Sequence, residues 1–227
     1  MMASQGGIVA LVPARGGSKG LPGKCVRPLH GVPLYQHAVN HALAAGIGRV
    51  VISTDIDSIL DSPAQTGVSP VRRPAALAQD ATPMIDVLLH HLDTGDLGDG
   101  LVVLLQPTSP LRTPADIDAG LSRFRDGGYD LVMSVCEGDR SVLKWGLAHG
   151  GRFQSLNDPA YTFANRQSLP AVVRPNGAVY VIDSGWLRHH RRLDGGRTGC
   201  FLMPAGRSHD IDTQADFDRC TDLLAKS

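Results

Sequence analysis

Two groups of residues, one near each end of the chain, have the types and spacing for chemistry on phosphate. Residues 13–24, PARGGSKGLPGK, combine four glycines with three cationic side chains. Glycines let backbone N–H groups close around an anion, and cations neutralise its charge. Near the other end, Asp210 and Asp212 are two positions apart, which puts both carboxylates on one face of an extended backbone. Magnesium binds one or two carboxylates plus substrate phosphate oxygens, so this pair matches a triphosphate substrate.

The glycine-rich stretch differs from the two best-known phosphate loops. Aligned on its last glycine and lysine, a Walker A loop would need glycine at Ser18 and a hydroxyl residue at Cys25. The dinucleotide-binding pattern G-x-G-x-x-G also fails, because Ser18 lies two residues beyond Gly16. A flexible charged connector is the alternative, but the apolar run 8–12 leads directly into the stretch and is typical of a buried strand. We therefore expect a polyphosphate-binding loop at a strand end.

The acid pair is a weak signal when taken alone. Asp212 is followed by Thr213, and such a pair could merely cap the last helix. The motif QPTSP at residues 106–110 has the same ambiguity, since it could be no more than a turn before a helix. An assignment from the sequence becomes specific only when several such motifs occur in one order along the chain.

Residues 13–20 read PARGGSKG, 106–112 read QPTSPLR, 174–178 read RPNGA and 210–213 read DIDT. In this order, and over nearly the whole chain, these motifs resemble the acylneuraminate cytidylyltransferases, the CMP-sialic acid synthetase family. The resemblance implies transfer of CMP from CTP to the anomeric hydroxyl of a 2-keto-3-deoxy acid sugar, sialic acid or a relative, with release of pyrophosphate. It also implies Mg²⁺ as the cofactor and CTP as a substrate.

The resemblance further implies roles for individual residues. Nucleotide binding falls to Arg15, Gly16, Gly17, Ser18, Lys19, Lys24, Arg73 and Thr82. Contacts to the sugar or to phosphate fall to Gln106, Lys144, Arg166, Arg174, Asn176 and Tyr180. The metal would be held by Asp210 and Asp212, and catalysis would depend on Lys19, Lys24 and Asp212. Two positions depart from the family, because Cys25 replaces the usual Asn and only Thr82 supplies a hydroxyl in the stretch 80–84.

Two other functions remain open. One is a relative that activates another acid, such as an eight-carbon sugar or a phosphonate. The other is a catalytically silent nucleotide-binding protein of the same fold. A silent binder needs no metal pair, so the presence of both lysines and both aspartates favours an enzyme (Lys19, Lys24, Asp210 and Asp212).

The elements that must position these residues alternate between strands and helices. Strands are predicted at 8–12, 50–53, 101–105, 131–135, 178–182 and 201–203, and helices at 33–44, 83–92, from 113 onward and at 213–225. This alternation indicates an α/β fold, a Rossmann-like three-layer α/β/α sandwich with a mostly parallel, mixed sheet, in one domain over 1–227. Ligands bind beyond the carboxyl ends of such strands, which predicts that one edge gathers Arg15, Ser18, Lys19, Lys24, Asp55, Gln106, Ser109 and Asp183.

The alternation fails between about 137 and 175, where Gly, Pro and polar residues mix with Trp145, Phe153, Tyr161 and Phe163. A long irregular insert in a compact domain is usually functional or forms an interface. We expect a dimerisation arm, with a mobile surface loop as the alternative. Family members are typically homodimers whose inserted arm reaches the partner's site, which agrees with this expectation.

The overall composition restricts the partners. Lys+Arg and Asp+Glu are both 22 in 227 residues, so no net field attracts the chain to nucleic acid or to a membrane surface. The cysteines are too dispersed for a zinc site or a disulfide framework (Cys25, Cys136, Cys200 and Cys220). No apolar run is long enough for a membrane span or a signal peptide, so we expect a cytoplasmic protein.

Overall fold

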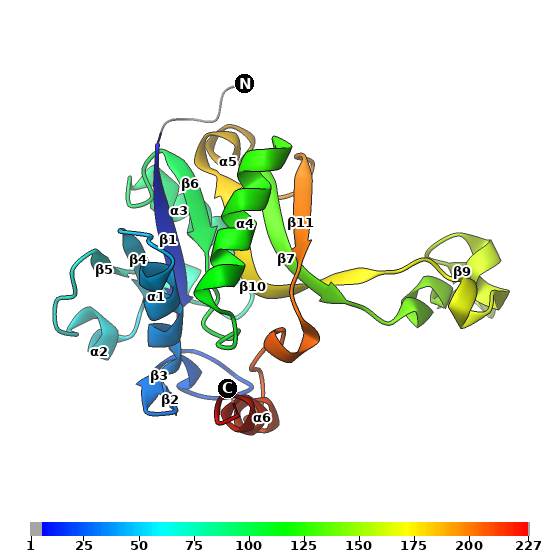
Figure 1. Cartoon of the computed structure of the whole chain (residues 1–227), viewed down its shortest axis with the longest axis horizontal. Coiled ribbons are helices and arrows are strands. Elements are labelled where there is room, and N and C mark those ends of the chain that lie inside the picture. The colour runs from blue at the N-terminus through cyan, green and yellow to red at the C-terminus, as the bar shows by residue number, and fades with distance from the viewer. Residues whose placement is uncertain (1–5, 227) are drawn as a thin grey trace.

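A seven-stranded mixed sheet forms the centre of the structure, a computed structural model that describes residues 6–226. The strand order is β11-β7-β10-β6-β1-β4-β5, and among these described strands only β10 runs antiparallel to its neighbours (Figure 1). The strands span β1 Gly7–Ala14, β4 Val50–Thr54, β5 Val68–Arg72, β6 Gly100–Leu104, β7 Leu131–Glu137, β10 Val173–Asp183 and β11 Thr198–Leu202. The predicted mostly parallel, mixed sheet is confirmed.

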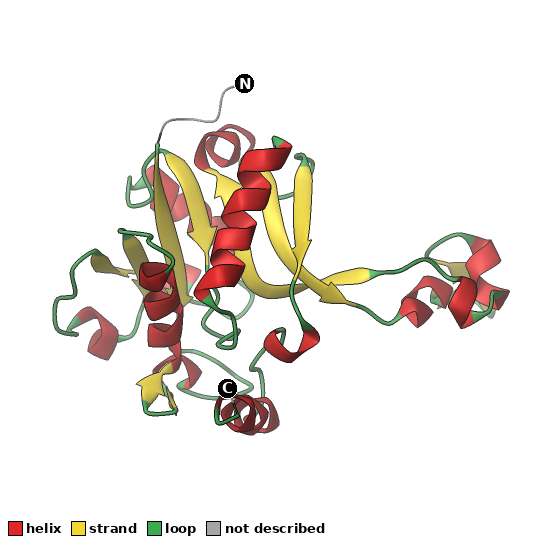
Figure 2. Cartoon of the chain, viewed as in Figure 1, coloured by secondary structure: helices red, strands yellow, loops and turns green. Residues whose placement is uncertain are grey.

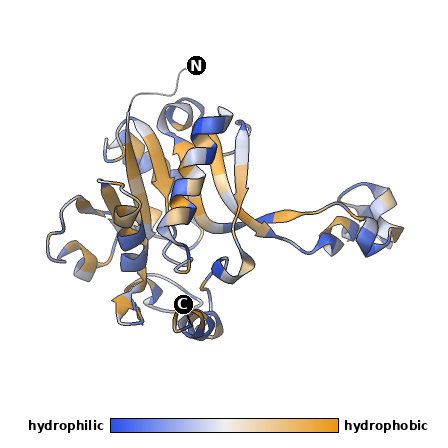
Figure 3. Cartoon of the chain, in the orientation of Figure 1, coloured by the Kyte–Doolittle hydropathy of each residue, from blue (hydrophilic) through white to orange (hydrophobic). Residues whose placement is uncertain are grey.

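Helices cover both faces of the sheet (Figure 2). On one face, α1 (Leu34–Ala44) and α4 (Pro114–Gly127) pack in the same apolar cluster as Ala10 and Val12 of β1. On the other face, α3 (Met84–Asp93) and α5 (Ser184–His190) pack with Val9 and Leu11. Because β1 is buried on both faces, its sequence is continuously apolar rather than alternating, as Figure 3 shows for the central strands. The three-layer α/β/α prediction is confirmed.

A third apolar cluster joins the two ends of the chain. It contains Leu21 from the glycine-rich loop, Leu29 from the short strand β2 (Pro28–Leu29), and Phe217 and Cys220 from α6 (Gln214–Leu224). β2 pairs with β3 (Val32–Pro33), and η1 (Lys24–Val26) precedes it. The last helix therefore packs against the base of the loop, which fixes the C-terminal segment beside it.

Several elements were not predicted from the sequence, among them β5, α2 (Asp57–Leu60) and α5. The edge strand β5 contains Pro70, which lacks a backbone N–H and is typical of sheet edges, so its sequence does not read as a strand. Helix α2 is a single turn. In the part of the chain that the structure describes, none of the helices combines the length and apolarity that crossing a membrane requires.

The antiparallel direction of β10 shows that one prediction was wrong, namely that Asp183 lies at the same sheet edge as the glycine-rich loop. Asp183 pairs with Leu101 near the start of β6, so it lies at the edge opposite to the other polar strand-end residues. There its carboxylate accepts a 2.7 Å hydrogen bond from the backbone N–H of Trp186 and caps α5. The same reversal brings the beginning of β10, with Arg174 and Asn176, toward the edge where the parallel strands end. Strand direction depends on tertiary pairing, which the sequence pattern does not contain.

The insert projects from the body as an arm (yellow in Figure 1). It is more regular than expected, since β8 (Gly146–His149) and β9 (Arg152–Ser155) form an antiparallel hairpin flanked by the 3₁₀ turns η3 (Arg140–Lys144), η4 (Pro159–Phe163) and η5 (Arg166–Ser168). A hydrogen bond of 3.0 Å from Gly138 N to Val172 O closes its base. Four of its large apolar side chains are strongly exposed, namely Trp145 59%, Phe153 57%, Leu156 57% and Phe163 93%, whereas Tyr161 is partly buried.

Candidate active site

A cleft of about 440 Å³ lies where the parallel strands end. It brings together eight of the residues singled out from the sequence, namely Arg15, Ser18, Lys19, Lys24, Arg73, Gln106, Asp210 and Asp212. Cys25, Asp80, Met84 and Thr108 are also in its wall. The cations of the first loop and the acid pair of the C-terminal segment therefore share one cavity, as the sequence predicts.

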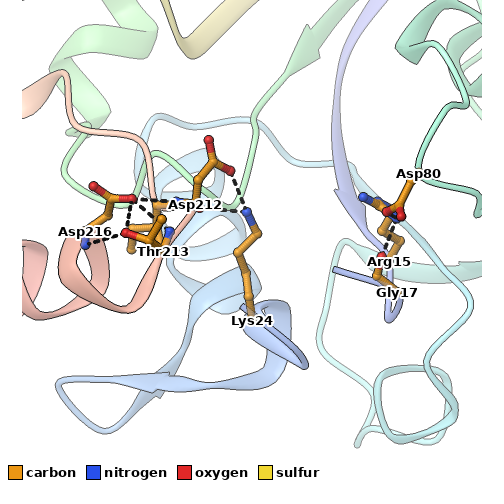
Figure 4. A network of polar contacts seen from close by, with 8 residues as sticks. Arg15, Gly17, Lys24, Asp80, Asp212, Thr213 and Asp216 are labelled. Carbon is orange, nitrogen blue, oxygen red and sulfur yellow. Dashed lines mark hydrogen bonds and ion pairs between the residues drawn. The ribbon is translucent and has the colours of Figure 1, made fainter. Parts of the chain in front are cut away.

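Lys24 connects the two halves of the cleft directly (Figure 4). Its side chain is buried, and its Nζ donates to the carbonyl oxygen of Ile211 at 2.6 Å and to Oδ1 of Asp212 at 3.0 Å. Gly20 approaches the same segment so closely that a Cβ there would stand 2.4 Å from the carbonyl oxygen of Asp212. Only glycine fits this approach, so Gly20 permits the contact that Lys24 secures.

Asp80 pairs with two cations of the loop. Its carboxylate lies 2.9 Å from the Nζ of Lys19 and 2.6 Å from Nη1 of Arg15. Hydrogen bonds from Lys19 and Arg15 lower the pKa of Asp80. Asp80 thus forms ion pairs with the same two cations that a bound triphosphate would need. The sequence did not indicate this role, because a single aspartate outside any motif has no distinguishing pattern.

The backbone of the loop is held from a neighbouring strand end. The N–H of Gly16 donates to Oδ1 of Asp55 at 2.8 Å, directly after β4. Gly17 accepts a hydrogen bond from Arg15 (Figure 4) and borders an adjoining cavity instead of the cleft itself. These contacts fix the loop from behind and leave the cations at the cleft surface.

The acid pair has an excess of negative charge. Desolvation raises the pKa of Asp210, and the nearby charge of Asp212 raises it further, while a hydrogen bond from Thr108 and the charge of Lys24 oppose both effects. Two carboxylates beside one lysine favour an added cation. Among the described residues, no group of three or more His, Cys, Asp or Glu is arranged so that it could hold a metal ion.

The alternative role of Asp212 as a helix cap does not fit the structure. The N-cap of α6 is Thr213, whose hydroxyl accepts from the N–H of Asp216. In return Asp216 accepts from the N–H of Thr213 at 2.8 Å, which completes a capping box. The side chain of Asp212 is therefore free of the cap and points to Lys24 (Figure 4).

The turn that carries Gln106 is anchored by a buried arginine. Arg112 is only 1% exposed, and its Nη1 and Nη2 each donate to the carbonyl oxygen of Gln106 at 2.8 Å. Nη1 also donates to the carbonyl oxygen of Ala178 at 3.0 Å, which ties the turn to β10. Burial lowers the pKa of Arg112 to about 9, with the charge of Asp116 opposing the shift. Arg112 belongs to the QPTSPLR motif, but the sequence did not indicate this anchoring contact.

The predicted sugar-contacting residues of β10 have different surroundings. Arg174 is exposed at the start of the strand, and Tyr180 is partly buried, with a pKa raised by burial and by the charge of Asp210. Asn176 is buried. Its Oδ1 accepts from Ser134 at 2.6 Å and its Nδ2 donates to Ser208 at 2.9 Å. Asn176 thus uses its amide inside the protein and lies outside the wall of the cleft.

Six other predicted residues also lie outside the wall of the cleft of a single chain, namely Gly16, Thr82, Lys144, Arg166, Arg174 and Tyr180. Lys144 and Arg166 are on the arm, where Arg166 pairs with Asp139 at 3.3 Å. Thr82 donates to the carbonyl oxygen of Ala76 at 3.4 Å. Their predicted roles in binding are therefore not explained by the cleft of one chain alone.

A mixed α/β sheet with a basic glycine-rich loop facing an acid pair across one cleft defines a nucleotidyltransferase architecture. The sequence model of the cytidylyltransferase family matches residues 9–181. The chain belongs to this family.

Relatives and solved structures agree with this membership. The chain is 32% identical over 225 residues to CMP-N,N'-diacetyllegionaminic acid synthase of Legionella pneumophila, covering 92% of this chain and 93% of the relative. It is 30% identical over 221 residues to N-acylneuraminate cytidylyltransferase of Streptococcus agalactiae serotype III, covering 92% of this chain and 51% of that protein. The chain thus spans about half the length of the streptococcal relative. In fold it is similar to a CMP:2-keto-3-deoxy-manno-octonic acid synthetase solved with CTP, with a TM-score of 0.70 at 19% identity over 97% and 99% of the two chains.

Proposed function

We propose that this enzyme transfers CMP from CTP to the anomeric hydroxyl of a 2-keto-3-deoxy acid sugar, sialic acid or a relative, and releases pyrophosphate. The observation that carries the proposal is the contact between Lys24 and Asp212, which unites the cationic loop and the acid pair in one cleft. The names of two relatives support the acceptor class, because they specify N-acylneuraminate and N,N'-diacetyllegionaminic acid. With CTP as the donor, we place the enzyme in the cytoplasm.

The loop would bind the triphosphate. Arg15, Lys19 and Lys24 supply positive charge, and Ser18 supplies a hydroxyl as a hydrogen-bond donor. Asp210 and Asp212 would hold Mg²⁺, which neutralises charge on the phosphate oxygens when bound. Asp80 would give up its two cations to the incoming phosphates, since both anions compete for the same donors.

The chemical step needs alignment more than a protein nucleophile. The oxygen of the anomeric hydroxyl attacks the α-phosphorus and its proton passes to water, while the bond to the bridging oxygen of pyrophosphate breaks and the departing group takes the electron pair. Arg15 and Lys19, which line the cleft, would stabilise that charge as it develops. Lys24 would orient the carboxylate of Asp212 through the 3.0 Å hydrogen bond that its Nζ donates to Oδ1. Orientation and electrostatic stabilisation thus account for the reaction.

The acceptor would lie on the β10 side of the cleft. Gln106, Arg174 and Tyr180 would contact it from the same chain, with Asn176 positioning the start of β10 through its buried hydrogen bonds. Lys144 and Arg166 would reach the cleft of a partner, because their arm extends away from their own body (Figure 1). We therefore propose a homodimer, with the exposed aromatic side chains of the arm at the interface.

The test is release of pyrophosphate from CTP, with and without Mg²⁺, across a panel of acceptors. We expect release with sialic or legionaminic acid that depends on Mg²⁺ and is lost with EDTA. Release only with an eight-carbon acid sugar or a phosphonate would replace the proposed acceptor while retaining the cytidylyl transfer. Binding of CTP without release for any acceptor would establish the silent nucleotide-binding protein instead.

A further inference from the structure

A chain of hydrogen bonds runs behind the wall of the cleft and ends at Arg73. Nε of Arg73 donates to Oγ of Ser53 at 3.0 Å, and Nη2 donates to the carbonyl oxygen of the same serine at 2.9 Å. Oγ of Ser53 lies 2.6 Å from Nε2 of His91, and Nδ1 of His91 lies 2.8 Å from Oδ2 of Asp96. Ser53 is in β4, His91 is in α3 and Asp96 follows that helix, so three separate segments support one arginine.

With a neutral His91, the donors and acceptors of this chain match in one arrangement. Burial alone would raise the pKa of Asp96, but hydrogen bonds outweigh it and lower the pKa, so Asp96 is an ionised acceptor. Nδ1 of His91 must then carry the proton, which leaves Nε2 as an acceptor for the hydroxyl of Ser53. With its proton donated to His91, the Ser53 oxygen has lone pairs for Nε of Arg73. Desolvation lowers the pKa of His91, which favours this neutral tautomer.

The order Asp96, His91, Ser53 is that of a hydrolytic triad, but the surroundings exclude a nucleophile. Ser53 and His91 are both 0% exposed. Ser53 also lies within a strand paired on both sides, with Pro13 of β1 and Val71 of β5. A substrate carbonyl has no access to its hydroxyl, and the lone pairs of that oxygen are used by Arg73. The arrangement therefore supports another residue and does no covalent chemistry itself.

Arg73 connects this chain of hydrogen bonds with the cleft. Its side chain is 3% exposed, yet it is in the wall of the cleft and of the adjoining cavity of about 840 Å³, which also includes Arg15 and Asp55. Its two hydrogen bonds to Ser53 use Nε and Nη2, so they fix the plane of the guanidinium and leave Nη1 for a group in the cleft. Desolvation lowers the pKa of Arg73, and the charge of Asp55 opposes that shift.

We propose that Ser53, His91 and Asp96 are positioning residues that aim the guanidinium of Arg73 at the bound nucleotide. The inference rests on the proposed function in one respect, namely that the cleft binds CTP. It predicts that the hydroxyl of Ser53 affects nucleotide affinity only through Arg73. A serine needed merely for folding would affect stability without this dependence on Arg73.

The experiment is a double-mutant cycle on the dissociation constant of CTP, measured by calorimetry without acceptor. The variants are Ser53→Ala, Arg73→Leu and the double variant. We expect Ser53→Ala to weaken CTP binding about tenfold when Arg73 is present, as for one lost hydrogen bond to a charged group, and less than about twofold in the Arg73→Leu background. Ser53→Thr keeps the hydroxyl and should stay within about twofold of the wild type.

Variants of His91 provide a second, independent test in case Ser53→Ala does not fold. His91→Gln keeps an acceptor for the Ser53 hydroxyl, whereas His91→Leu removes it. We expect near-native CTP affinity for His91→Gln and about a tenfold loss for His91→Leu that disappears in the Arg73→Leu background.

The outcomes separate this inference from the proposed function. Equal losses with and without Arg73, or no loss on removing the hydroxyl, would overturn the positioning role while leaving CTP binding intact. A wild-type chain that binds no CTP would overturn the proposed function, and this inference with it.

Discussion

Nζ of Lys24 lies 3.0 Å from Oδ1 of Asp212, although 188 positions separate the two residues in the sequence. The contact is possible because α6 packs on the loop through Leu21 and Phe217, and because Gly20 has no side chain where the C-terminal segment passes. Loop and acid pair are thus one structural unit, and a change on either side of it should disturb the reaction.

Asp212→Asn should reduce turnover by about a hundredfold or more, because it removes a charge that the metal would need and keeps the size of the side chain. CTP binding measured without Mg²⁺ should stay within about threefold, since the loop cations remain. Pyrophosphate release and calorimetry measure the two effects. Asp222→Asn, at an exposed position of the following helix α6, is the matched control. Undiminished turnover in Asp212→Asn would refute the metal role.

Gly20→Ala should lower kcat/KM for CTP at least about tenfold, because the new Cβ would meet the backbone of Asp212 at 2.4 Å and push the loop from the acid pair. Neither group can yield as a flexible side-chain tip would. Gly206→Ala is the control, since nothing lies within 4 Å of its Cβ position. Equal activity of the two variants would show that the close approach is unimportant for catalysis.

Asp80→Asn should tighten inhibition by pyrophosphate by about threefold to tenfold, because it releases Arg15 and Lys19 from a competing carboxylate. The effect should shrink at high salt, where exposed charges are screened. The inhibition constant is measured at two ionic strengths. Asp99→Asn breaks an ion pair with Arg188 and serves as the control. Weaker inhibition would mean that Asp80 orients the cations instead of competing for them.

The proposed homodimer predicts complementation between two inactive variants. Arg166→Ala damages the arm and Asp212→Asn damages the cleft, so a mixed dimer contains one cleft with an intact arm from its partner. Mixing the two should restore up to about a quarter of wild-type turnover, because half of the dimers are mixed and each has one complete site. No recovery, with mixed dimers verified by mass spectrometry, would place Arg166 in the cleft of its own chain or outside catalysis.

Phe163→Asp should convert the dimer into a monomer without unfolding the chain, because this side chain is 93% exposed in a single chain. Sedimentation measures the assembly, and circular dichroism verifies the fold. Leu202→Asp, another exposed apolar position at 58% but on β11 instead of the arm, is the control. A wild-type chain that sediments as a monomer would contradict the interface.

The sequence alone established the class of fold and the chemical character of the site. Alternating strands and helices are encoded locally, through apolar periodicity and turn residues, so the three-layer sheet could be predicted. The glycine-rich loop and the acid pair could also be recognised, because their residue types are unusual and close in sequence. Their common cleft followed from the rule that ligands bind where parallel strands end.

Tertiary structure decided what depends on strand direction and on contacts between distant segments. The antiparallel course of β10 moved Asp183 to the far edge and brought Arg174 toward the cleft. Asp80 and His91 acquired their roles from partners on other elements, Lys19 and Ser53. Such pairings depend on the summed packing energy of the whole chain, and for that reason no local pattern around either residue could have predicted them.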